Sequence, residues 1–236
     1  MTLLVHGVVA DHSVDTSAMG DIADVYTVSA GGIAALVSDV RDEPVLPSRA
    51  MMLRHANVLE AAAATTTVVP MRFGVAVPSR DALRDEFLHP AQAQLTEALS
   101  YLRGRSEWRL RGDYVENEAI RAVLANDRRA ASLRGRRDTD AKMELGERIV
   151  QGVSGLRDRD TPEVLGHLRE HVVELVSRDV TEPLACLDAS LLVDDEGQEA
   201  LERHVEQLAE RFAPRLQLRL VGPLPPYSFA AMETTR

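Results

Sequence analysis

The sequence predicts an α+β protein with two domains, an N-terminal α+β unit and a C-terminal ferredoxin-like domain with extra helices. Three observations predict this class. Two β-rich runs flank a glycine pair near the N-terminus, which is a hairpin signal. The second half orders its elements as strand, helices, strand, strand, helix and strand. No long flexible linker interrupts the chain, so we place the domains at 1–103 and 104–236, the second with a Pro-rich C-terminal tail.

The N-terminal domain is expected to begin with strands. Residues 3–9 form a short apolar run that ends at a turn-like segment, 11–13. The runs 25–28 and 33–37 are rich in β-branched and apolar residues and lie on either side of Gly31-Gly32. This pattern is typical of two antiparallel strands joined by a tight turn.

A helix should follow the hairpin. Residues 47–49 can open it, because apolar residues then recur at spacings of three and four as far as residue 63. The helix should end before the three β-branched residues 65–67, which favour a strand that continues through Val69. The first part of the chain therefore predicts a ββαβ-like unit.

A second helix is expected from Ser79, with one continuous apolar stripe over 87–102. Pro90 lies inside this stripe, so a kink or a break is expected near His89. Polar and apolar residues then alternate over 107–111, as they do in a half-buried strand.

In the second domain, the clearest start signal is Thr161 as an N-cap with Pro162 at the first helical position. We expect that helix to run to Val176. The other expected elements are helices around 120–124 and 145–156, strands at 180–184 and 187–193, a helix through 201–212 and a closing strand at 216–220.

The charge and the apolar content of the chain argue against two classes of partner, nucleic acids and membranes. The formal net charge is −10, which argues against broad nucleic-acid binding because phosphates need clustered cations. One arginine cluster lies at 128–137, but it lacks aromatic residues for base stacking, so we interpret it as a solvated segment between helices rather than an RNA site. No stretch approaches the roughly 20 apolar residues that span a bilayer, and the N-terminus does not resemble a secretory signal. We expect a soluble cytoplasmic protein without nucleic-acid or membrane partners.

No pattern in the sequence indicates an enzyme. The single cysteine, Cys186, lies in an apolar run, and we interpret it as a buried structural thiol rather than a nucleophile. The residues 167–171 match the H-x-x-E-H spacing of one class of zinc peptidases. On a helical wheel, however, both histidines fall at the edge of the polar face and the glutamate within it, so we interpret the match as chance. No phosphate loop, dinucleotide turn or nucleophile elbow is present, and we expect no catalytic residue, no cofactor and no metal.

Two segments are not explained by ordinary packing. In 68–74, Pro70 ends strand pairing and Gly74 permits an unusual backbone angle, with a cation and an aromatic ring between them. In 222–229, three prolines hold the chain extended while Tyr227 and Phe229 can anchor it in an apolar groove. Two interpretations of this tail stay open: it seals its own domain interface, or it binds a partner directly.

These segments carry a family resemblance. The chain resembles the gas vesicle protein family of the F/L type (GvpF/GvpL) over nearly its whole length. Leu224 stands where this family often has tryptophan, and His6 stands in an opening strand where an aromatic residue is more usual. The matching motifs are His55-Ala56-Asn57-Val58-Leu59-Glu60, Val69-Pro70-Met71-Arg72-Phe73-Gly74, Glu107-Trp108 and Gly222-Pro223-Leu224-Pro225-Pro226-Tyr227-Ser228-Phe229.

The resemblance implies a non-enzymatic accessory protein of gas vesicle assembly, located in the cytoplasm and at the gas vesicle. It implies as partners the small hydrophobic shell protein and other gas vesicle accessory proteins. It also suggests which residues to test as family-motif or partner-binding positions. These are Pro70, Arg72, Phe73, Gly74, Trp108, Gly222, Pro223, Pro225, Pro226, Tyr227, Ser228 and Phe229.

An alternative from another functional class is a cytoplasmic small-molecule sensor. It rests on fold analogy, because ferredoxin-like domains often bind metabolites between their strands and helices.

Overall fold

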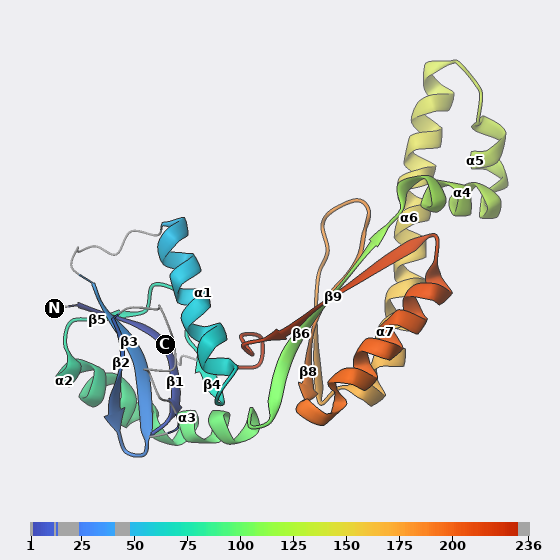
Figure 1. The fold of residues 1–236 in the computed structure, drawn as a ribbon. Helices are drawn as coiled ribbons and strands as arrows, with labels where there is room; N and C mark the ends of the chain where they lie inside the picture. Colours follow the sequence, from blue (N-terminus) through green and yellow to red (C-terminus); the bar gives the residue numbers. More distant parts are fainter. Residues whose placement is uncertain (1, 12, 14–23, 41–47, 231–236) are drawn as a thin grey trace. The chain divides into compact units, whose positions relative to one another are not determined.

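A computed structural model describes residues 2–11, 13, 24–40 and 48–230 (Figure 1). The chain is mixed helix and sheet, which confirms the predicted α+β class. It divides into two compact units: unit 1 comprises Met1–Glu107 and Pro223–Arg236, and unit 2 comprises Trp108–Gly222. In this division the C-terminal tail belongs to unit 1, whereas the sequence-based division assigns it to the second domain.

Unit 1 contains a five-stranded sheet in which the strand β1 is central. The order is β2-β3-β1-β4, with β5 also paired to β1, and β1 is antiparallel to β3, β4 and β5. The strands are β1 (Thr2–Ala10), β2 (Val25–Ala30), β3 (Ile33–Val40), β4 (Val68–Pro70) and β5 (Ala76–Val77).

The predicted hairpin is confirmed. Ala30 pairs with Ile33 across the turn, and Gly31 and Gly32 have φ angles of 60° and 88°. A two-residue turn with positive φ at both positions matches the twist of the strands that it joins, and glycine adopts it at little steric cost.

The predicted helix after the hairpin is also confirmed as α1 (Arg49–Ala63). The Ser48 hydroxyl caps it by accepting a hydrogen bond from the Met51 N–H. One face of α1, including Val58 and Leu59, is buried against the sheet. The N-terminal cap and the buried apolar stripe therefore both favour a helix in this segment.

The expected break near His89 is present. The short helix α2 (Arg80–Ala82) leads into a π-helical segment, Leu83–Leu88, before α3 (His89–Tyr101) begins with Pro90 in its first turn. A proline has no N–H to donate to the preceding turn, and a π-helical turn is one way to accommodate this loss.

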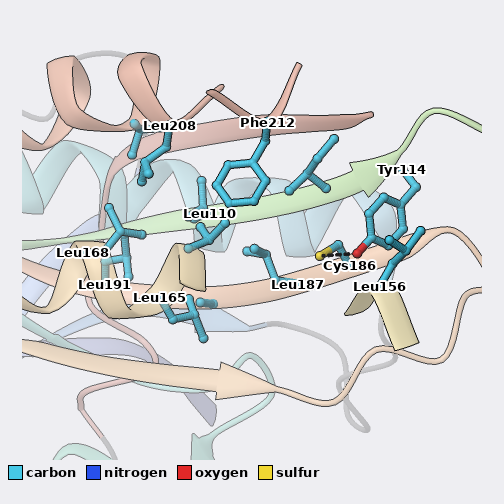
Figure 2. Close-up of a cluster of buried hydrophobic side chains, with 14 of the residues drawn as sticks. Leu110, Tyr114, Leu156, Leu165, Leu168, Cys186, Leu187, Leu191, Leu208 and Phe212 are labelled. Atoms are coloured by element: carbon cyan, nitrogen blue, oxygen red, sulfur yellow. Dashed lines mark hydrogen bonds between the residues drawn. The ribbon is translucent and has the colours of Figure 1, made fainter. Parts of the chain in front are cut away.

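Unit 2 is built on a four-stranded sheet of order β7-β8-β6-β9, in which β7 and β8 are antiparallel. Its buried core joins residues of the sheet to α6 and α7, including Leu110, Leu165, Leu187 and Phe212 (Figure 2). The elements are β6 (Arg105–Tyr114), α4 (Glu116–Asn126), α5 (Arg128–Leu133), α6 (Thr139–Leu168), β7 (Glu174–Arg178), β8 (Ala185–Asp194), α7 (Gln198–Phe212) and β9 (Leu216–Leu224).

The expected helix start at Thr161 is wrong, because α6 runs through Pro162 without interruption. The Thr161 hydroxyl donates to the carbonyl of Cys186 at 2.9 Å instead of capping a helix. Leu156 and Leu165, on either side of the proline, are buried in the same core. Because apolar residues before and after Pro162 are buried in one core, the segment forms one continuous helix, although the local sequence signals favour two.

The expected extension of that helix to Val176 and the expected strand at 180–184 are also wrong. The helix α6 ends at Leu168, a 3-10 turn follows at Arg169–His171, and the strand is Glu174–Arg178. Strand pairing determines the structure of this segment, because each residue of β7 pairs with a residue of β8.

Candidate functional site

A buried chain of three polar side chains links the sheet of unit 1 to α1. The register of β1 against β3 shifts between Val5 and Gly7, so His6 occupies a bulge. Its Nδ1 lies 3.0 Å from Nδ1 of His55 on α1, and its Nε2 lies 3.0 Å from Oγ of Ser38 on β3.

The Met71 carbonyl, which can only accept, determines the directions of these hydrogen bonds. Nε2–H of His55 donates to the Met71 carbonyl at 2.9 Å, so the Nδ1 of a neutral His55 accepts from His6. Nε2 of His6 then accepts from the Ser38 hydroxyl. Burial, the neighbouring His55 and Arg54 lower the pKa of His6 to about 3, and burial also lowers the pKa of His55. Both rings are therefore neutral at physiological pH.

The Ser38–His6–His55 series of contacts resembles a nucleophile, a base and an orienting group, although the three residues are far apart in the sequence. Its burial points to a structural role: His6, Ser38 and His55 are 0%, 3% and 3% exposed. Ser38 Oγ is therefore not accessible to a substrate in this structure. The histidines are 49 residues apart and lie on β1 and α1, which pack against each other, so no local spacing could reveal the contact.

The segment 70–74 is held by the same histidines. The Met71 N–H donates to the His6 carbonyl at 2.9 Å, and the ring of Phe73 meets His55 edge-on at 5.6 Å between centroids. Gly74 has a φ angle of 97°, which favours glycine. Arg72 is exposed between these fixed points, and its guanidinium has no hydrogen-bond or ion-pair partner among the described residues.

The C-terminal tail is fixed to unit 1 by Glu107. The Glu107 carboxylate is buried and accepts two hydrogen bonds from Ser228, one from the N–H and one from the hydroxyl, both at 2.7 Å. Pro225 and Pro226 are buried, while Tyr227 between the anchored residues is exposed. Rigid prolines and a charged acceptor thus hold one aromatic side chain at the surface.

Helix α1 connects the two motifs. His55 contacts the 70–74 segment. Glu60, five residues further along the helix, is close enough to Tyr227 that the partial burial of this ring, together with the Glu60 carboxylate, raises the Tyr227 pKa to about 12. The outward side of α1 also exposes Met52 and Leu53. We name Met52, Leu53, Glu60 and Tyr227 the α1 face.

The suggested motif residues divide by exposure. Arg72, Gly74, Pro223 and Tyr227 are exposed; Phe73, Gly222, Ser228 and Phe229 are half-buried; and Pro70, Trp108, Pro225 and Pro226 are buried. In unit 2, Gly222 lies flat on Trp108, since a Cβ at this position would come within 2.4 Å of the indole ring. The buried residues and Gly222 are thus accounted for by packing in this structure.

The two histidines of the H-x-x-E-H segment contact other side chains. His167 accepts a hydrogen bond from Arg211 at 2.9 Å, and His171 packs on His204 with 4.3 Å between ring centroids. Within the part of the chain that the structure describes, no group of three or more His, Cys, Asp and Glu side chains is placed to hold a metal ion.

Cys186 is buried, as expected, and burial raises its pKa. Its thiol donates to the Tyr114 hydroxyl at 3.4 Å (Figure 2). The Tyr114 hydroxyl in turn donates to Asp160 at 2.9 Å. Arg215 in turn donates to both Asp160 oxygens. This network belongs to the core of unit 2 rather than to a nucleophilic site.

A cavity of about 300 Å³ lies between α4 and α6. It differs from the place where the sensor alternative expects a ligand, because helices and not strands form its walls. Its lining residues are Ala122, Val123, Asn126, Asp127, Gly152, Gly155, Leu156 and Arg159. Among the described helices, none is long and apolar enough to span a lipid bilayer.

This chain is similar in sequence to gas vesicle proteins of two other organisms. Gas vesicle protein F of Streptomyces sp. (strain CB03234) is 30% identical over 244 residues, which cover 97% of this chain and 99% of the relative. Gas vesicle protein F of Nostoc sp. (strain PCC 7120 / SAG 25.82 / UTEX 2576) is 25% identical over 87% of each chain.

Two crystal structures share the fold. GvpF from Anabaena sp. PCC7120 has a TM-score of 0.83 and 23% identity, covering 98% of both chains. GvpF from Microcystis aeruginosa has a TM-score of 0.79 and 22% identity, covering 98% of this chain and 99% of the other. The family described as gas vesicle synthesis protein GvpL/GvpF matches residues 2–231. The chain therefore belongs to the GvpL/GvpF family of gas vesicle synthesis proteins.

Proposed function

We propose that this chain is an accessory protein of gas vesicle formation that binds the small hydrophobic shell protein and assists its nucleation or assembly. The observation that carries the proposal is the exposed α1 face in a chain whose family serves gas vesicle synthesis. Met52, Leu53 and Tyr227 are 47%, 54% and 43% exposed, and all three belong to unit 1.

The physical need is to cover apolar surface. A subunit that builds a gas-filled wall exposes a large apolar face, and such faces aggregate unless a partner covers them before assembly. The apolar side chains of the α1 face can cover part of that surface. The net charge of −10 then keeps the complex dispersed.

The motifs around α1 give the face a fixed shape. His55 and Phe73 hold one side, and the Glu107–Ser228 pair holds the other. A preformed surface loses little conformational entropy on binding. Arg72 beside it offers a guanidinium that is free to pair with a carboxylate of the partner.

The role is non-enzymatic and includes contacts with other gas vesicle accessory proteins, in the cytoplasm and as a minor component at the vesicle. Within it, we assign unit 2 to a ferredoxin-like domain with extra helices. The support is its element order, β6, helices, β7, β8, α7, β9, together with the sheet order β7-β8-β6-β9.

A deletion strain tests this role. We expect loss of vesicles on deletion, recovery with the wild-type gene, and impaired recovery with Arg72→Ala or Tyr227→Ala at unchanged protein level. Arg203→Ala, an exposed arginine on α7, is the control and should restore vesicles fully. Normal vesicles in a clean deletion strain would refute the role, and unfolding of both test variants would make the two motifs structural.

A further inference from the structure

Unit 2 carries a concentrated positive patch at one end. Residues 128–137 contain five arginines and no acidic residue, so this segment has a charge of +5 and the remainder of the chain has −15. Two of the five have partners, since Arg129 pairs with Glu144 and Arg136 pairs with Asp138. The other three, Arg128, Arg134 and Arg137, are exposed.

We name Arg128, Arg134 and Arg137 the arginine tip. Among the described residues, none of their three guanidinium groups has a hydrogen-bond or ion-pair partner. Neighbouring arginines that share no carboxylate repel one another, and they favour a partner that supplies negative charge.

The same unit carries a matching negative surface on α7. Glu202, Glu206 and Glu210 are spaced four residues apart, so they lie along one side of the helix. All three are exposed, and within the described part of the chain none is paired. We name them the glutamate stripe. The opposite side of α7 is buried in the core through Leu201, Val205 and Leu208, which fixes the stripe outward.

The two surfaces are too far apart to neutralise each other within one molecule. The α5 region contacts α6 through Glu144 and Arg148, whereas α7 contacts it through Glu163 and His167. Fifteen residues of continuous helix between Arg148 and Glu163 span about 22 Å. This exceeds the screening length of about 8 Å at physiological salt, and Figure 1 shows α5 and α7 along different halves of α6.

We propose that the arginine tip of one molecule binds the glutamate stripe of a second copy. Three free cations then meet three free carboxylates, and each patch finds the charge that its own molecule cannot supply. The contact joins two different surfaces, so each molecule keeps one free tip and one free stripe. Such a contact is head-to-tail and produces chains or rings rather than an isolated symmetric dimer.

Sedimentation velocity of the full chain tests this contact. At about 0.05 M salt, where charges act over roughly 14 Å, we expect the average mass to rise with protein concentration above the monomer mass of 25.9 kDa. At about 0.5 M salt the mass should return to that of the monomer.

Charge reversal separates this contact from other kinds of association. Arg134→Glu/Arg137→Glu and Glu206→Arg/Glu210→Arg should each remain monomeric alone at low salt, with unchanged circular dichroism. An equimolar mixture of the two variants should associate, because the stripe of the first variant meets the tip of the second and the reversed tip of the first meets the reversed stripe of the second. The fourfold variant should associate again. Arg121→Glu, which alters an exposed arginine on α4, is the control and should associate like the wild type.

Three results would overturn the proposal: a wild type that stays monomeric at low salt, association that persists in both reversed variants, or a mixture that stays monomeric. Binding of a labelled single-stranded RNA by a monomeric wild type, lost in the tip variant, would assign the arginine tip to nucleic acid instead.

Discussion

Glu107 accepts two hydrogen bonds from Ser228, a residue 121 positions away, through one buried carboxylate. One donor is the backbone N–H and the other is the hydroxyl, and each bond is 2.7 Å long. Two charge-assisted bonds to a single residue fix its position and its orientation together. This pair holds Tyr227, the neighbouring residue, at the surface.

Ser228→Ala removes one of these bonds and keeps the other. Hydrogen bonds to charged groups contribute about 1.5–3 kcal/mol, so we expect the free energy of unfolding to fall by about 2 kcal/mol. Limited proteolysis should also cut the tail sooner than in the wild type. Ser154→Ala, at an exposed position on α6, is the matched control: it should not lower the free energy of unfolding, because alanine is a good helix former, and it should not change the cutting of the tail. Equal stability of the two variants would show that the pair does not anchor the tail.

The two buried histidines predict an acid-sensitive stability. Both pKa values are lowered on folding, that of His6 to about 3 and that of His55 in the same direction. Above pH 6.5 the rings are neutral in both states, so their contribution is fully present there. Between pH 6.5 and about 3 the unfolded chain binds protons that the folded chain does not, and stability is lost as pH falls.

Urea unfolding from pH 8 to pH 4 measures this loss. We expect His6→Leu to be less stable than the wild type at pH 8, because Ser38 and His55 lose their partner, but flatter below pH 6.5. His89→Gln changes an exposed histidine and should keep the wild-type slope. Parallel pH profiles for His6→Leu and the wild type would mean that His6 does not set the acid sensitivity.

Two glycines of unit 2 should respond oppositely to alanine. At Gly222 the new Cβ would come within 2.4 Å of Trp108, so Gly222→Ala should destabilise the protein by about 1–3 kcal/mol. At Gly166, inside α6, the Cβ would meet nothing within 4 Å, so Gly166→Ala should stabilise the protein by up to about 1 kcal/mol. Thermal unfolding of both variants checks the sign, and a neutral Gly222→Ala would mean that the strand can shift away from the ring.

The sequence predicted those elements in which local chemistry and tertiary packing agree. The hairpin turn needs positive φ at Gly31 and Gly32, and α1 has both its Ser48 cap and its apolar stripe. The prediction failed where burial overrides a local signal. Pro162 marks a helix start in the sequence, yet the core on either side of it keeps α6 continuous.

The sequence indicated which motifs belong to the candidate site, but not how their residues are arranged in space. Two of the segments that carry the family resemblance meet on α1, but contacts such as Glu107–Ser228 and His6–His55 join residues 121 and 49 positions apart. A β-bulge and a long-range hydrogen bond create them, and neither has a sequence period. The resemblance therefore indicated which residues to examine, while the three-dimensional contacts separated the buried ones from the exposed ones.

The most direct test measures binding isotherms of the purified shell protein with three forms of this chain: the wild type and two variants in which an exposed apolar residue is replaced by glutamate. The wild type should bind saturably. Leu53→Glu on the α1 face should weaken binding by about tenfold or more, since a charge replaces an apolar contact. Val150→Glu changes a residue of unit 2 that is 70% exposed, and it should bind like the wild type. A wild type that does not bind, or a Leu53→Glu variant that binds as well as Val150→Glu, would contradict the claim that the α1 face holds the shell protein.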